Sequence, residues 1–260
     1  MNNAPSFGLL SIAISACAVF ASASIVAQYD INAILQKQGT GMRMEDDNDP
    51  FVANEFTGSF SMEMHLFDGP TEMKESPMNL RYWSSENKML VQMSVPGQGS
   101  RDVKMMTDLE GKWQYMLMTD TEGKRMAMKS RKKKMVLSDS LRKEQTGKPE
   151  TDITITNEKK TIEGRTCTKV IGKSEDGLWT GWVARDLKGP YADMAKHIRA
   201  SDAAMNKHMM ELPGFALEFE WAPTDGKNRI VCYIKDLVPG TVDTDVFSID
   251  GYEMIQIPGK

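Results

Sequence analysis

Catalytic and metal-binding residue types are scarce in this sequence. Its 260 residues include only three Cys and three His, which leaves little material for a metalloenzyme or for a fold held by disulfide bonds. The sequence also lacks a Gly-x-Ser-x-Gly nucleophile motif, a His-Glu-x-x-His zinc motif and a glycine-rich phosphate loop. These absences favour a protein that is not an enzyme and that uses no metal or other cofactor.

Positive charge is not in excess either. The 32 Lys and Arg are balanced by 36 Asp and Glu, for a net charge of −4, which argues against a nucleic-acid-binding protein. The hydrophobic share of 40% excludes a disordered chain. Methionine is abundant: its 21 residues outnumber Phe (9), Trp (5) and Tyr (6) combined. Because thioether side chains are flexible and polarisable, they suit an adaptable apolar surface.

The first 27 residues predict export. They contain no charged side chain, and residues 7–27 are almost all apolar or small, which is typical of a secretory signal peptide cleaved after Ala27. Two less favoured interpretations are a retained membrane anchor and a lipoprotein signal at Ile14-Ser15-Ala16-Cys17. All three place the body in the periplasm or outside the cell. Cys167 and Cys232 are then the remaining thiols, either joined in one disulfide bond or separately buried.

Alternating apolar and polar residues predict a sheet over most of the chain. From Phe56 to Leu66 every second residue is apolar or Gly, as expected for a half-buried strand. Turn residues such as Asp68-Gly69-Pro70 separate this strand from later ones, which favours an antiparallel meander. The further strands are predicted at 78–82, 89–95, 103–105, 113–117, 126–128, 153–155, 166–171, 178–184, 215–221, 230–234 and 252–257.

Two helices and a linker complete the predicted organisation. Residues 28–55 are expected to form a short helix, Asp30 to Lys37, and a solvated acidic linker that includes Glu45, Asp46, Asp47 and Asp49. Residues 56–260 then form one domain, with a helix inserted near 191–210, where apolar residues follow helical spacing. The predicted fold class is α+β: a curved antiparallel half-barrel with helices packed on one face.

Several short runs carry a family resemblance. They are Ile162–Lys169, Trp182–Asp186, Leu212–Glu218, Asp245–Ile249 and Gly251-Tyr252. In this order, behind an export signal and a Met-rich meander, they resemble an uncharacterised family of secreted bacterial domains of unknown function. That family is similar in outline to the periplasmic lipoprotein carriers of the LolA and LolB type. The resemblance implies a half-open barrel whose helices cover a lipid-binding cavity, and it transfers no individual site residue.

The leading functional hypothesis is an exported binding protein for a lipid or another apolar small molecule. A carrier that crosses water must enclose an acyl chain, because exposing it costs about 0.8 kcal/mol per CH₂. The alternative is an ordinary core in which Met fills gaps. The predicted ligand-binding residues share the apolar parity of their strands: Phe60, Met62, Met64, Leu66, Met89, Val91, Met93, Met105, Tyr115 and Leu117.

Two other functions stay open. Soft thioethers select Cu(I), with candidate clusters at Met62, Met64 and His65 and at His208-Met209-Met210. On a strand, however, Met62 and Met64 share one face while His65 lies on the other. A structural envelope protein without a small ligand is the third hypothesis.

A run of basic residues offers a second candidate site. The cations could bind anionic lipid headgroups of the envelope membrane surface or an acidic protein, or could protect an edge strand from aggregation. They are Lys129, Arg131, Lys132, Lys133 and Lys134.

Overall fold

The structure is a computed structural model that describes residues 42–74, 76–94, 103–120, 122–137, 152–174, 177–190, 193 and 212–256. Within these ranges α-helical geometry is confined to Pro190 and Asp193, and no helix is long and apolar enough to cross a membrane. The signal peptide, the helix at 30–37 and, apart from Asp193, the helix near 191–210 lie outside the described residues. The described structure therefore contains the predicted sheet without helices packed on a face.

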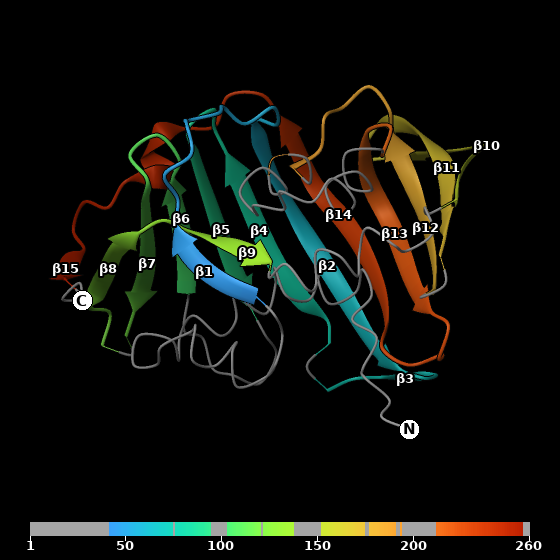
Figure 1. The fold of residues 1–260 in the computed structure, drawn as a ribbon, viewed down its shortest axis with the longest axis horizontal. Helices are drawn as coiled ribbons and strands as arrows, with labels where there is room; N and C mark the ends of the chain where they lie inside the picture. The colour runs from blue at the N-terminus through green and yellow to red at the C-terminus, as the bar shows by residue number, and fades with distance from the viewer. Residues whose placement is uncertain are drawn as a thin grey trace.

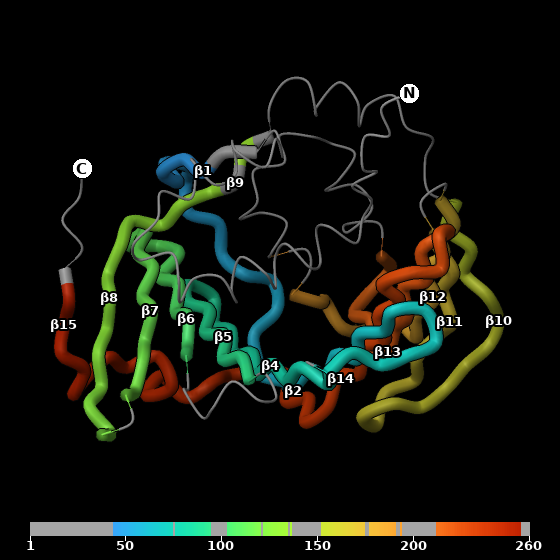
Figure 2. Tube along the Cα trace, turned by 90° about the horizontal axis from the view of Figure 1, so that it is seen from below, coloured from blue at the N-terminus to red at the C-terminus, as the bar shows by residue number. Residues whose placement is uncertain are grey.

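One large open sheet forms the body, and both views show it curved into a trough (Figures 1 and 2). Neighbouring strands are antiparallel, except that β15 runs parallel to β8, and β3 (Thr71–Glu72) pairs with β2 alone. This arrangement confirms the predicted curved antiparallel sheet. In spatial order the strands are β10 (Asp152–Ile162), β11 (Arg165–Lys173), β12 (Gly177–Ala184), β13 (Phe215–Pro223), β14 (Arg229–Pro239), β2 (Gly58–Asp68), β4 (Met78–Ser84), β5 (Lys88–Ser94), β6 (Val103–Asp108), β7 (Trp113–Thr119), β8 (Arg125–Arg131) and β15 (Glu253–Gln256).

The concave face of the trough is filled by aromatic side chains in its middle. Phe56 enters just before β2, and its ring centroid lies 5.8 Å from that of Phe60 and 5.7 Å from that of Phe215. The Asp193 carboxylate is fully buried and accepts hydrogen bonds from the backbone N–H groups of Glu55 (2.8 Å) and Phe56 (2.9 Å). These contacts fix the chain entering β2 against strand β13.

The convex face of β5–β8 is covered by the C-terminal segment. Phe247, in the 3-10 turn η1 (Thr244–Phe247), packs with Leu90, Tyr115 and Leu117. Strand β15 then lies against β8, where Lys124 pairs with Glu253 at 2.7 Å. The C-terminus thus closes the outer side of this wall and one edge of the sheet.

A separate two-stranded ribbon joins β1 (Met42–Asp46) to β9 (Lys133–Leu137). In both views it lies on the concave side, near β5–β8 (Figures 1 and 2). The predicted solvated linker is therefore wrong for residues 42–46, because these residues pair with a basic strand. Charge pairing over a long sequence separation, which no local pattern indicates, accounts for the difference.

Candidate functional site

Methionine side chains form two rows across the concave face of β5–β8. One row runs from Val91 through Met105 and Met116 to Met128, and the other from Met93 through Val103 and Met118 to Met126. In an antiparallel pair, directly opposed Cβ atoms lie about 4.5–5.5 Å apart, so the methionines of neighbouring strands are adjacent on this face. We name this surface the methionine wall. It consists of Met93, Val103, Met105, Met116, Met118, Met126 and Met128.

The methionine wall is less tightly packed than the middle of the trough. Met116, Met118, Met126 and Met128 are half-buried. Within the part of the chain that the structure describes, these four side chains belong to none of the packed apolar clusters. These four methionines therefore keep part of their apolar surface exposed on the concave face.

Two of the predicted ligand-binding residues lie on the opposite face. Tyr115 and Leu117 alternate with Met116 and Met118 along β7, and they pack beneath Phe247 on the convex side. The prediction that they share a wall with Met105 is wrong. Both parities of β7 are apolar, so sequence alternation alone could not assign them, and Met116 and Met118 were missed for the same reason.

The other predicted ligand-binding residues do share the concave face. Phe60 and Val91 lie in the aromatic cluster, with Met62, Met89 and Met93 packed against it. Met64 and Leu66 pack with Ile230 and Cys232 in a neighbouring cluster. Ligand binding at these positions stays a prediction. Met93, which is half-buried, and Met105, which is buried, also belong to the methionine wall.

The cations of the predicted basic site all have partners within the chain. Lys129 and Arg131 lie 4.0 Å and 4.1 Å from the ring centroid of Trp113. Lys132 pairs with Asp47, Lys133 with Asp46, and Lys134 with Asp49 at 2.8 Å. The acidic stretch of the sequence is thus the partner of the basic run, and binding of anionic headgroups by these cations stays a prediction.

Asp47 and Lys132 form the most buried of these pairs, with exposed side-chain fractions of 6% and 4%. Burial favours the neutral carboxyl, but the hydrogen bonds from Lys132 and Asp49, with the charges of Lys132 and Lys112, lower the pKa of Asp47 to about 2. Burial also lowers the pKa of Lys132, against the opposing effect of Asp47. The charged form of Asp47 is therefore stabilised, whereas burial disfavours the charged form of Lys132.

His65, on the convex side of β2, lies between two carboxylates. Its Nε2 lies 2.9 Å from Glu63 Oε1 and its Nδ1 lies 2.6 Å from Glu72 Oε1. The hydrogen bonds with Glu63 and with Glu72 raise the pKa of His65, against a smaller effect of burial. A carboxylate oxygen beside each ring nitrogen favours the imidazolium form, in which both nitrogens donate.

Replacing His65 by Gln should remove a pH-dependent contribution to stability. A raised folded-state pKa stabilises the fold fully below the unfolded value of about 6.5, and this stabilisation is lost as pH rises through the folded value. Urea unfolding between pH 5.5 and 8.5 measures it. The wild-type free energy of unfolding should fall more steeply with pH than that of His65→Gln, and parallel profiles would contradict the expected role of the network.

Both cysteines are free, buried thiols, so the disulfide alternative is not what the structure shows. Cys167 packs in the aromatic cluster and Cys232 beside Met64. Burial raises the pKa of Cys167, which disfavours a reactive thiolate. Among the described residues no group of His, Cys, Asp and Glu could hold a metal ion, and the predicted copper cluster at His208-Met209-Met210 lies outside them.

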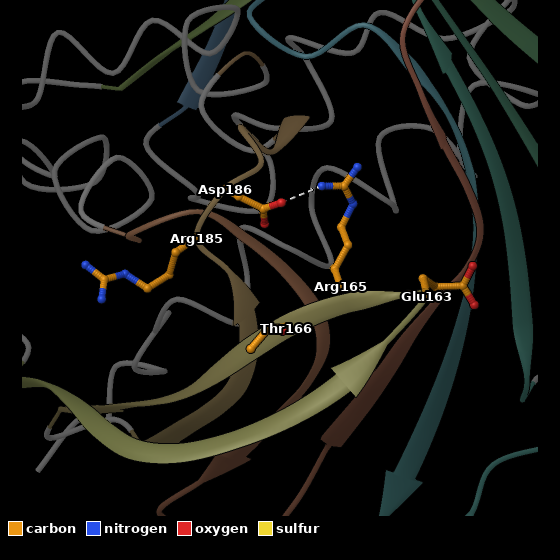
Figure 3. Close-up of a pocket in the computed structure, with 6 residues that line it drawn as sticks. Glu163, Arg165, Thr166, Arg185 and Asp186 are labelled. Atoms are coloured by element: carbon orange, nitrogen blue, oxygen red, sulfur yellow. Dashed lines mark hydrogen bonds and ion pairs between the residues drawn. The ribbon is translucent and has the colours of Figure 1, made fainter.

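A polar cleft of about 580 Å³ lies beside the β10–β11 hairpin (Figure 3). The hairpin turns at Glu163 and Gly164, which both have positive φ (49° and 71°), as two-residue hairpin turns require. Arg165 donates to Asp186 at 2.6 Å, while Arg185 points away from this pair (Figure 3). Since Glu163 and Asp186 balance the two arginines, the cleft has no net charge to select an ionic ligand.

The sequence matches no protein-family model and no curated protein. Three of the solved structures similar to it are PNGF-II (9% identity, 77% of this chain and 31% of that chain, TM-score 0.33), the lipoprotein LppX of Mycobacterium tuberculosis (11%, 73% and 91%, 0.33) and a putative outer membrane lipoprotein-sorting protein domain from Vibrio parahaemolyticus (10%, 75% and 91%, 0.22). The chain thus spans about a third of PNGF-II. Two of the three have lipoprotein or lipoprotein-sorting names.

Proposed function

We propose that this protein is an exported, non-enzymatic binding protein that holds a lipid or another apolar ligand against the methionine wall. The observation that carries the proposal is the in-register block of half-buried thioethers on the concave side of an open sheet. Unbranched methionine side chains can adjust to acyl chains of different shape. The uncharged N-terminal segment supports export, and with it a place in the cell envelope.

A variant of the methionine wall tests ligand binding. It makes two wall side chains polar while nearly preserving their shape. In Met116→Gln with Met128→Gln, each amide loses its water when a ligand covers it, at a cost of about 1–3 kcal/mol. We therefore expect the Kd for a fluorescent fatty acid to rise at least tenfold. The matched control is Met73→Gln with Met254→Gln, whose side chains are about 40% exposed and lie outside the wall.

Three results would contradict the proposal. They are the absence of lipid from solvent extracts of the protein purified from its native envelope, no uptake of the fluorescent fatty acid, and equal Kd values in the wall and control variants. The first two together would favour a structural envelope protein without a small ligand.

Cu(I) binding is the second candidate function. The structure offers a set of copper ligands in the methionine wall that is better arranged than the clusters expected from the sequence. Met116 lies directly opposite Met128, and Met118 directly opposite Met126, so four soft ligands share one face within two residues of each other. Replacing all four by Leu nearly preserves apolar volume and removes sulfur. Loss of Cu(I) competition with fatty acid uptake intact would support copper, and unchanged Cu(I) competition would exclude these four ligands.

A further inference from the structure

The β1–β9 ribbon is a continuation of the sheet wall, bent over the concave side. Strand β8 ends at Arg131 and β9 begins at Lys133, so Lys132 is the one residue between them. Figure 2 shows the chain turning there from the end of β8 across the mouth of the trough, and Figure 1 shows the ribbon in front of β5 and β6. Lys132 is therefore the junction between the wall strand β8 and the ribbon.

Asp47 fixes the angle of this bend. Its carboxylate binds Lys132 at the bend and also lies 3.5 Å from Lys112 Nζ, which immediately precedes β7. Two backbone hydrogen bonds link the same three residues. Asp47 N–H donates to Lys132 O (2.9 Å), and Lys132 N–H donates to Lys112 O (3.0 Å). The buried Asp47 carboxylate and these two backbone hydrogen bonds thus join the ribbon to the wall.

Further ion pairs hold the two strands of the ribbon together. Lys134, with 6% of its side chain exposed, pairs with Asp49 at 2.8 Å. The pair of Lys133 with Asp46 is about half exposed, so salt screens it and it contributes little. The buried contacts at the bend, rather than the exposed pair, therefore determine whether the ribbon keeps its position.

The ribbon bends away from a strand that contributes to the methionine wall. Strand β8, from which the ribbon bends, carries Met126 and Met128 of the methionine wall on its concave face. We propose that the β1–β9 ribbon is a strap that controls entry to the methionine wall, hinged at Lys132 and held closed by Asp47. This inference rests on the proposed function and adds its regulation: ligand exchange requires the Asp47 bridge to open.

The test is a change in exchange rates without a change in affinity. In Asp47→Asn the bridge loses its charge, so we expect association and dissociation rates of the fluorescent fatty acid to rise about tenfold, with Kd within about twofold. Hydrogen exchange should accelerate at residues 42–46 and 133–137 and stay unchanged in β6 and β7. Lys112→Met, which removes one side of the bridge, should give the same changes at smaller size and provides a second variant should Asp47→Asn fail to fold.

The matched control is Glu158→Gln, which removes an exposed ion pair with Lys169 on the opposite wall and should alter neither rate. Faster hydrogen exchange of the ribbon with unchanged ligand rates would overturn the strap and leave the proposed function standing. Absence of fatty acid binding in the wild type would overturn the proposed function, and the strap with it. A change in Kd without a matched change in both rates would assign Asp47 a purely structural role and also overturn the strap.

Discussion

Phe215→Ala should lower the free energy of unfolding by about 3–5 kcal/mol, one of the two largest losses that we expect from a single substitution. The Phe215 side chain is fully buried, and its ring meets Phe60 at 5.3 Å and Phe56 at 5.7 Å in edge-to-face contacts. Removing it leaves a cavity between β13 and β2 that rigid aromatic neighbours cannot fill. Urea unfolding monitored by circular dichroism measures the loss.

The control for this substitution is Phe51→Ala. Phe51 is 40% exposed, so its removal should cost less than about 1 kcal/mol. A comparably small loss for Phe215→Ala would show that the two walls of the trough are not joined through this aromatic cluster.

Asp193→Asn should cost about 2–4 kcal/mol, because it weakens two charge-assisted hydrogen bonds in a fully buried position. The amide that replaces one carboxylate oxygen is a donor, and it would face the N–H of Glu55 or Phe56, which is also a donor. The substitution nearly preserves shape, so the loss reports hydrogen bonding and charge rather than volume.

Urea unfolding of Asp193→Asn beside Asp186→Asn provides the comparison. Asp186 pairs with Arg165 on the surface, with 63% of its side chain exposed, so its neutralisation should cost less than about 1 kcal/mol. Equal losses for the two variants would show that Asp193 does not fix the segment that enters β2.

Local alternation was sufficient to predict most of the sheet. The apolar parity from Phe56 to Leu66 belongs to β2, and twelve of the described strands coincide with predicted ones. Each of these strands has one apolar and one polar face, or is bounded by Gly, Pro or Asn turns. Where one face of a strand is apolar and the other polar, the sequence of that strand contains the information on which face is buried.

The candidate site could be predicted only in part. Strand register determines which residues share a face, and long-range pairing determines which charges lie together. Along β7, Tyr115 and Met116 are equally compatible with burial, and only pairing with β6 and the C-terminal cover at Phe247 separates their faces. Asp47 and Lys132 are 85 positions apart, so the acidic and basic runs each resembled solvated surface. Their pairing depends on the bend after β8, which no local pattern encodes.

The order of strands has a consequence for how the chain reaches this structure. Strands β4–β8 follow one another along the sequence as they do in space, but β14 must return to pair with β2, and their ion pair of Lys235 with Glu63 joins residues 172 positions apart. Contacts of such separation form late, since loop closure opposes them. Until the last strands form, β2 would therefore present an unpaired edge to other chains. The final stretch from Arg229 to Gln256 pairs with β2, covers the convex wall and borders β8, so its synthesis sets the moment at which the nascent trough stops being prone to aggregate.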